Sequence, residues 1–198
     1  MSDSPEQSTE VIVIGASAGG LSALHRLLPC FPATFPLRLI IVSHVASGSG
    51  STRLNMLQDK CALPVREPED KESVEPGIVF LAPSDYHLLI ETDGSFSYSC
   101  DDPVQYSRPS IDVLFESAAE AYGRTLTGVI LTGANADGAL GLKSVRKYGG
   151  YAMVQNPTTA EAPAMPQAAL DLAGADRILE LEEIGPCLAS LASEKERS

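Results

Sequence analysis

The 198-residue chain has no long hydrophobic run and little positive charge. No apolar stretch approaches the roughly 20 residues that span a bilayer, so we expect no membrane insertion. Only 14 lysines and arginines stand against 26 acidic residues, and the formal net charge is −12. Nucleic acids and anionic lipids both need a basic surface, so neither is the expected partner.

Export signals and metal-binding cysteine motifs are also lacking. Residues 1–10 carry no basic start followed by an apolar stretch, as a secretory signal would. The four cysteines are scattered, with no Cys-x-x-Cys pair. We therefore expect a cytoplasmic protein with reduced thiols and no metal site. The composition predicts one globular domain over 11–192, with flexible tails at 1–10 and 193–198.

Between the tails, short apolar runs alternate with stretches of helical periodicity. Strands that are apolar throughout are typical of a parallel sheet covered on both faces. The segment 78–99 breaks this rhythm and predicts antiparallel strands over 78–81, 86–91 and 95–99. The expected fold is α/β: a doubly wound, mostly parallel sheet flanked by helices on both faces, with an antiparallel hairpin. The other strands are expected at 11–14, 37–42, 127–131, 151–155 and 177–181, and the helices at 21–28, 52–58, 111–122, 139–148 and 166–172.

Three residue types that together form a hydrolytic triad each follow a predicted strand. Ser17 follows the first strand, in the turn GASAG at 15–19, and His44 follows the second. Asp137 lies in the loop after the strand that ends at 131. In doubly wound sheets, ligands bind beyond the carboxyl ends of the strands. A serine needs a histidine to take its proton, and the histidine needs a carboxylate to orient it, so the pattern predicts a serine hydrolase.

The histidine count supports His44. The chain has only three histidines, and His44 alone lies in a strand-end loop. His25 falls within the first predicted helix, and His87 falls in the middle of a predicted strand. The alternative that His44 only terminates its strand, and so has a purely structural role, stays open.

The glycine-rich turn has other interpretations. GASAGG between a strand and a helix also resembles a dinucleotide cradle, but that use needs an acidic residue after the second strand, where Ser43 and His44 stand. No Tyr-x-x-x-Lys pair and no P-loop accompany the turn. The nucleophile elbow of α/β-hydrolases has the same glycine spacing, but its residues follow a different order along the chain. A tight structural turn remains the third alternative.

Six motifs occur in order along nearly the whole chain: IGASAGG (14–20), IIVSHVASGSGSTRLNML (40–57), GIVFLAPSDYHLLI (77–90), YSRPSIDVLFESAA (106–119), LTGANADGALGLKSVRKYGG (131–150) and AMPQAAL (164–170). Together they resemble the catalytic domain of the CheB-type protein-glutamate methylesterases of bacterial chemotaxis.

The resemblance implies Ser17 as the nucleophile, His44 as general base and acid, and Asp137 as the orienting carboxylate. It implies hydrolysis of γ-glutamyl methyl esters on the cytoplasmic helices of methyl-accepting chemotaxis receptors, giving glutamate and methanol, with deamidation of glutamine in some members. It implies no metal and no organic cofactor. Family members typically carry a receiver domain before the catalytic domain. Only about ten residues precede the first strand here, so a separate receiver or kinase is a candidate partner.

The expected oxyanion site departs from the family pattern. Ala18 stands where threonine is usual, and Ala134-Asn135 stands where Met-Gly is usual. We expect N–H groups of the turn, Ala18 and Gly19 among them, and of the loop 133–136 to bind the oxyanion. Alanine can still donate its N–H, and asparagine tolerates a positive φ better than most residues.

Three further residues are candidates for contacting substrate. Arg108 and Arg53 are candidates for binding substrate carboxylates, although a structural ion pair explains Arg53 equally well. Met165 is a candidate for lining the cleft or for filling the core. Two other functions stay open: hydrolysis of a different ester or amide, and a catalytically degenerate signalling or docking module.

Overall fold

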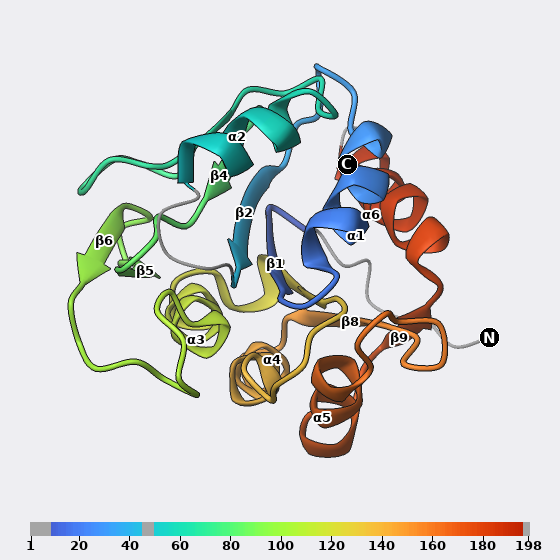
Figure 1. The fold of residues 1–198 in the computed structure, drawn as a ribbon. Helices are drawn as coiled ribbons and strands as arrows, with labels where there is room; N and C mark the ends of the chain where they lie inside the picture. Colours follow the sequence, from blue (N-terminus) through green and yellow to red (C-terminus); the bar gives the residue numbers. More distant parts are fainter. Residues whose placement is uncertain (1–8, 45–49, 196–198) are drawn as a thin grey trace.

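A computed structural model describes residues 9–44 and 50–195. In this part of the chain, seven parallel strands form one sheet in the order β3-β4-β2-β1-β7-β8-β9 (Figure 1). The α/β fold predicted from the sequence is confirmed. The strands are β1 (Val11–Ala16), β2 (Arg38–Ser43), β3 (Val65–Arg66), β4 (Val79–Leu81), β7 (Leu126–Ile130), β8 (Tyr151–Gln155) and β9 (Arg177–Leu179).

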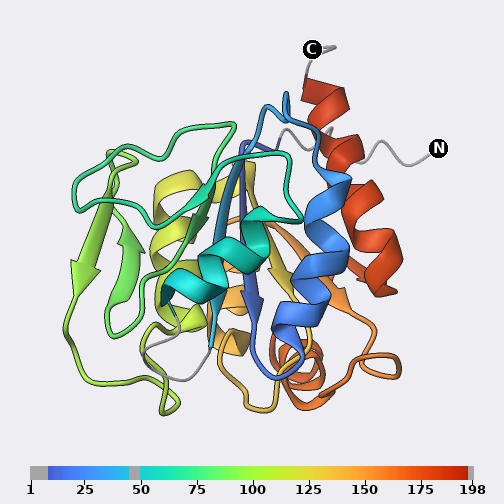
Figure 2. The same ribbon diagram turned by 45° about the horizontal axis from the view of Figure 1, so that its top comes forward.

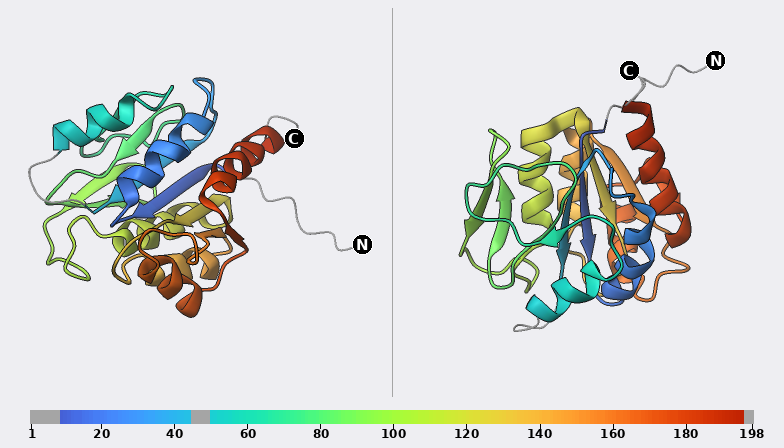
Figure 3. Two further views of the ribbon diagram at one scale, coloured as in Figure 1. Left: turned by 45° about the vertical axis from the view of Figure 1, so that its right-hand side comes forward. Right: turned by 90° about the horizontal axis from the view of Figure 1, so that it is seen from above.

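Helices cover both faces of the sheet (Figure 3). On one face lie α1 (Gly20–Leu27), α2 (Gly50–Gln58) and α6 (Leu181–Lys195), and on the other lie α3 (Ile111–Tyr122), α4 (Ala139–Lys147) and α5 (Ala164–Leu172). Short 3₁₀ helices, η1 (Leu28–Cys30) and η2 (Gly123–Thr125), follow α1 and α3.

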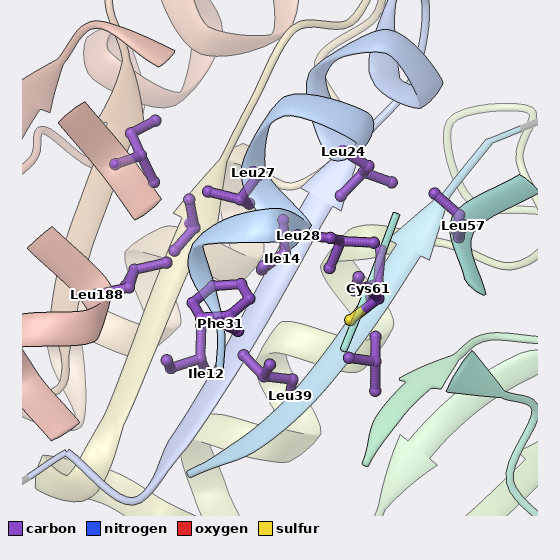
Figure 4. Packing of buried hydrophobic residues seen from close by; sticks show 14 of the residues in the cluster. Ile12, Ile14, Leu24, Leu27, Leu28, Phe31, Leu39, Leu57, Cys61 and Leu188 are labelled. Carbon is purple, nitrogen blue, oxygen red and sulfur yellow. The ribbon is translucent and has the colours of Figure 1, made fainter. Parts of the chain in front are cut away.

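Successive side chains of each strand point to opposite faces and so feed two hydrophobic cores. Ile12 and Ile14 of β1 pack with Leu24 and Leu188 in one core (Figure 4). Val11 and Val13 belong to the other core, beneath α3, α4 and α5. Because both faces of the central strand β1 are buried, it is apolar throughout, and such runs are what indicated a parallel sheet in the sequence.

The antiparallel hairpin consists of β5 (His87–Ile90) and β6 (Phe96–Ser99) and packs against α3. The prediction that 78–81 pairs with it was wrong. This segment is β4, which lies parallel between β2 and β3 in the main sheet. Its three residues are fully buried, as are those of β1 and β7 at the centre of the sheet. The two-residue strand β3 and the helix α6 were not predicted.

Described residues lie on both sides of the predicted domain range 11–192, whose boundaries stay a prediction. Thr9 is buried and its hydroxyl lies 3.0 Å from that of Thr127, while Glu10 N–H donates to Thr125 O at 2.8 Å. At the other end, α6 continues through Lys195. The rest of the predicted tails, 1–8 and 196–198, lies outside the described residues.

The winding of the sheet reverses at β1. The chain adds β2 and β4 on one side of β1, and β7, β8 and β9 on the other. The carboxyl ends of β1, β2 and β7 therefore meet at one edge of the sheet (Figure 2), which is the usual ligand site in this class of fold. Among the described residues, no helix is both long and apolar enough to cross a membrane.

Candidate active site

Ser17 lies in a tight turn where β1 passes into α1. Its N–H donates to Thr132 O at 2.9 Å, and its carbonyl accepts from Gly20 N–H at 2.7 Å. Gly19, the N-cap of α1, has φ 75°, a left-handed conformation that glycine adopts without a steric penalty. These contacts fix the turn and leave the Ser17 residue half-buried at the carboxyl edge of the sheet.

His44 lies at the adjacent strand end. Ala16 and Ser43 are partners in the parallel ladder, and His44 N–H donates to Ala16 O at 3.1 Å. Ser17 and His44 each follow one member of that pair, so they leave the sheet side by side. His44 Nε2 lies 2.7 Å from Asp137 Oδ2, and the His44 side chain is only 12% exposed. The fold thus joins two residues that are 93 positions apart.

The Asp137 carboxylate is fully buried and accepts four hydrogen bonds. Besides the bond from His44, Oδ2 accepts from Ile111 N–H at 2.7 Å, and Oδ1 accepts from Ser110 Oγ at 2.8 Å and Asp112 N–H at 2.9 Å. Burial by itself raises the pKa of Asp137. The hydrogen bonds from His44, Asp112 and Ile111 outweigh burial, so the pKa lies below its ordinary value. An ionised carboxylate here orients the imidazole and stabilises the imidazolium.

The other ring nitrogen of His44 faces Ser107. His44 Nδ1 lies 3.3 Å from Ser107 Oγ. When Nε2–H donates to Asp137, Nδ1 is the nitrogen that can accept a proton. In the described part of the chain, Ser17 makes no hydrogen bond to His44. The structure therefore brings His44 and Asp137 into contact, and it places Ser17 at the end of the neighbouring strand.

Backbone N–H groups around the turn can bind an anion. Within the described residues, the N–H groups of Ala18 and Gly19 have no acceptor, and they lie at the electropositive N-terminus of α1. On the facing loop, Gly133 N–H donates to Ala162 O at 2.9 Å and is already used. Of the loop 133–136, the N–H groups of 134–136 thus remain as candidate donors to the oxyanion.

Thr132 links the Ser17 turn to the loop that precedes α5. Its Oγ1 donates to Ala18 O at 2.9 Å and accepts from Ala162 N–H at 2.8 Å. The residue is almost fully buried. Thr132 was not assigned to the site from the sequence. Its position directly after a predicted strand was the one signal that could have indicated a role there.

A cavity of about 170 Å³ opens beside His44. Arg53 and Arg108 both line it. Arg53 is 3% exposed and makes no ion pair in the described part of the chain. Its guanidinium instead donates to Ser43 O at 2.9 Å and Ala82 O at 3.0 Å. Burial lowers the pKa of Arg53. These bonds fasten α2 to the ends of two strands.

Arg108 is held by the loop after β6. Its Nη1 donates to Cys100 O at 2.9 Å and Asp101 O at 3.0 Å. Contact of either arginine with substrate stays a prediction. The four cysteines are free thiols, and the described residues contain no cluster of three acidic, histidine or cysteine side chains that could hold a metal.

Comparison with known proteins identifies the family. The family model described as CheB methylesterase matches residues 12–188. The chain belongs to the CheB methylesterase family. The crystal structure of the Thermotoga maritima CheB methylesterase catalytic domain superposes with a TM-score of 0.88 at 33% identity, covering 93% of this chain and 99% of that one.

Two curated relatives differ in length. A protein of Leptospira interrogans is 48% identical over 175 residues, which is 88% of this chain and 91% of that protein. The protein-glutamate methylesterase/protein-glutamine glutaminase 1 of Carboxydothermus hydrogenoformans is 38% identical and matches 91% of this chain. The chain spans 55% of that longer relative.

The residues that depart from the CheB pattern are accommodated locally. Asn135 does not occupy the left-handed region, and its Oδ1 accepts from Asp137 N–H at 3.3 Å, which closes an Asx turn.

Met165, a candidate for lining the cleft, is 1% exposed, and its side chain fills the space next to Gly133. Met165 thus packs against the loop at Gly133, and a direct contact with substrate stays a prediction that its burial does not favour.

His87, Ser107, Ser110 and Asp112 support the CheB site but were not assigned to it from the sequence. His87 is buried, and its Nδ1 accepts from Ser110 N–H at 3.2 Å while Nε2 bonds to Asp102 O at 3.1 Å. His87 therefore positions the N-cap of α3, which in turn holds Asp137. Ser107, Ser110 and Asp112 all lie in the motif YSRPSIDVLFESAA (106–119), which was the available signal.

Proposed function

We propose that this chain hydrolyses γ-glutamyl methyl esters on methyl-accepting chemotaxis receptors in the cytoplasm, releasing methanol, and deamidates glutamine at the same site. The observation that carries the proposal is the 2.7 Å contact of His44 with Asp137 beside the Ser17 turn. The activity follows from membership of the CheB methylesterase family, in which the Carboxydothermus relative is named for both reactions.

In the proposed mechanism, Ser17 Oγ attacks the ester carbonyl while His44 Nδ1 takes the hydroxyl proton. Nδ1 has this role because Nε2–H is engaged by Asp137. In this mechanism Ser17 Oγ replaces Ser107 Oγ as the hydrogen-bond partner of Nδ1. Asp137 stays ionised and stabilises the imidazolium.

The tetrahedral oxyanion is bound by the N–H groups of Ala18 and Gly19, with further donors from 134–136. His44 then protonates the departing methoxide, and methanol leaves. Water attacks the acyl-enzyme with His44 again acting as base, and glutamate is released. The same steps with a carboxamide release ammonia.

The proposed substrate segment is a receptor helix that presents its glutamyl side chain to the edge of the sheet. Tyr106 is fully exposed at the rim of the cavity beside His44 and offers an aromatic surface to such a helix. Arg108 lines the same cavity and is the proposed contact for a neighbouring carboxylate of the helix. A separate receiver or kinase partner remains a further prediction of the sequence.

The test is methanol release from a methylated receptor fragment. Ser17→Ala should reduce the rate by at least about 1,000-fold, since the nucleophile is lost. Ser107→Ala is the matched control, because Ser107 also contacts His44 but supplies no nucleophile in the proposal. It should keep activity within about tenfold of wild type.

Three outcomes contradict the proposal. Absence of methanol release from the wild-type protein would exclude the methylesterase activity. Equal rates for wild type and Ser17→Ala would remove Ser17 from the mechanism. Loss of activity in Ser107→Ala, with activity retained in Ser17→Ala, would show that Ser107 and not Ser17 is the nucleophile.

A further inference from the structure

The helices α3 and α4 begin side by side, and each N-terminus is capped by a carboxylate from the other. Asp137, directly before α4, accepts from Ser110, Ile111 and Asp112 at the start of α3. Asp112, in the first turn of α3, has an Oδ1 that accepts from Gly138 N–H at 2.8 Å and from Gly141 N–H at 2.7 Å in α4. Unpaired N–H groups at a helix start favour such acceptors.

These reciprocal hydrogen bonds hold Asp137 both by its side chain and by the backbone that follows it. The carboxylate of Asp137 is held by the start of α3. The residue that follows it, Gly138, is held by Asp112. Displacing the Asp112 carboxylate would free the start of α4 and, with it, the backbone that carries Asp137. The orientation of His44 depends on Asp137, so the effect would reach the imidazole.

The close approach of the two helices requires glycine at 141. A Cβ added to Gly141 would lie 2.5 Å from Phe115 Cβ and 3.0 Å from Asp112 Cα. This proximity lets the Asp112 side chain reach two N–H groups of α4. The geometry is therefore built into the helix packing as well as into the carboxylates.

Asp112 is an unfavourable place for a charge. It is 3% exposed, and its Oδ2 is buried with no hydrogen-bond partner among the residues that the structure describes. Burial raises its pKa to about 6. The two N–H groups oppose this rise, while the negative charges of Asp137 and of Glu116, one turn further along α3, add to it. A buried carboxylate next to a second carboxylate is energetically unfavourable, which suggests that Asp112 has a role beyond packing.

We propose that Asp112 is a positioning residue for the esterase reaction, which holds Asp137, and through it His44, in the orientation needed for proton transfer. The inference rests on the proposed function for its kinetic readout. Asp112 contacts neither the substrate nor His44, so it acts only through Asp137.

The kinetic test compares Asp112→Ala and Asp112→Asn in methanol release from methylated receptor. Asp112→Ala loses both bonds to α4 and should lower kcat by 10- to 100-fold, with KM within threefold of wild type. Asparagine still offers an oxygen to both N–H groups, so Asp112→Asn should restore kcat to within about threefold. Asp176→Ala is the matched control, since Asp176 also accepts from a backbone N–H, that of Ala152 at 2.8 Å, but at the opposite edge of the sheet. It should leave kcat unchanged.

The second readout is the histidine-ring NMR spectrum, which contains only three rings because the chain has three histidines. The Nε2 proton that His44 shares with Asp137 should be visible in wild type and Asp112→Asn and should shift or broaden in Asp112→Ala. This readout needs no substrate. A wild type without methanol release would defeat the proposed function, whereas the His44 signal would still report on Asp112.

Wild-type kcat together with an unchanged His44 signal in folded Asp112→Ala would overturn the inference. A loss of more than 100-fold in folded Asp112→Asn would also overturn it, because the bonds to α4 would then not be what matters. If Asp112→Ala does not fold, Asp112→Ser replaces it. The shorter hydroxyl cannot bridge both N–H groups, and the same tenfold or greater loss of kcat is expected; wild-type kcat in the folded serine variant overturns the inference.

Discussion

At the scale of single residues, the two ring nitrogens of His44 have different partners, and this decides their roles. Among the described residues, Nε2 contacts a buried carboxylate that accepts four hydrogen bonds, whereas the one contact of Nδ1 is a serine hydroxyl at 3.3 Å. The first contact is short and charge-assisted, and the second is long and easily exchanged. We therefore assign orientation to Nε2 and proton transfer to Nδ1.

Replacing Asp137 by asparagine tests this assignment. The amide would donate toward Nε2 and place the ring proton on Nδ1, which could then no longer accept a proton from Ser17. We expect kcat to fall by about 10³- to 10⁴-fold, as for a triad with the wrong tautomer. Methanol release, with thermal unfolding to confirm the fold, measures the effect. Activity within tenfold of wild type would show that the carboxylate does not set the tautomer.

The titration of Asp112 predicts a pH dependence of stability. Its pKa of about 6 in the folded protein lies above the ordinary value of 3.8. The folded state therefore binds this proton more tightly than the unfolded state. The contribution is fully present below about pH 4 and is lost as pH rises through 6.

Asp112→Asn lacks this titration. The free energy of unfolding of wild type relative to Asp112→Asn should thus fall by about 2–3 kcal/mol between pH 4 and pH 7. Denaturant unfolding of both proteins at several pH values measures this difference. A difference that stays constant with pH would contradict the account.

The candidate catalytic residues could be proposed from the sequence, whereas the residues that hold them in place could not. Ser17, His44 and Asp137 could be proposed because functional groups gather beyond strand ends. Ser107 and Asp112 could not, because their roles depend on hydrogen bonds to segments 63 and 26 residues away. No local pattern encodes such distances.

At the scale of elements, the start of α3 is the organising feature of the site. Ser110 caps the helix, since its Oγ accepts from Val113 N–H at 3.4 Å, and also donates to Asp137. The sequence predicted α3 with both boundaries correct, because apolar periodicity and a serine cap coincide there. It misplaced 78–81, because a three-residue strand carries too little pattern to tell parallel from antiparallel pairing.

Substituting Gly141 with alanine tests the helix contact. Alanine usually stabilises a helix, but here its Cβ would meet Phe115 and Asp112 at 2.5 and 3.0 Å. We expect a loss of about 1–3 kcal/mol of stability from this overpacking, together with a lower kcat. Lys143→Ala on the exposed side of α4 is the control and should change stability by less than about 0.5 kcal/mol. A Gly141→Ala protein as stable and active as that control would refute the tight packing.

At the scale of the whole molecule, the net charge of −12 opposes an acidic substrate. The proposed substrate, a receptor segment that presents glutamates, carries the same sign, so we expect repulsion to slow association at low salt. We expect kcat/KM for a methylated receptor fragment to rise several-fold between about 20 and 200 mM NaCl, because salt screens the repulsion. A small uncharged ester should show no such rise. A fall in kcat/KM for the receptor would instead indicate attraction through a local basic surface.

The global fold was predictable because its parallel strands are buried on both faces and alternate with helices. The chain ends were less predictable. Thr9 gains order from Thr127, 118 residues away, and α6 extends past the predicted boundary. Such docking depends on partners distant in sequence.

The most direct test of the central claim is to map the serine that reacts with a fluorophosphonate probe. Ser107 contacts His44 and Ser17 lies at the adjacent strand end, and peptide mass spectrometry distinguishes the two serines. We predict a single adduct on Ser17, formed by wild type and Ser107→Ala and greatly slowed in Asp137→Asn. An adduct on Ser107, or none on Ser17 in the folded wild-type protein, would contradict the assignment of Ser17 as the nucleophile.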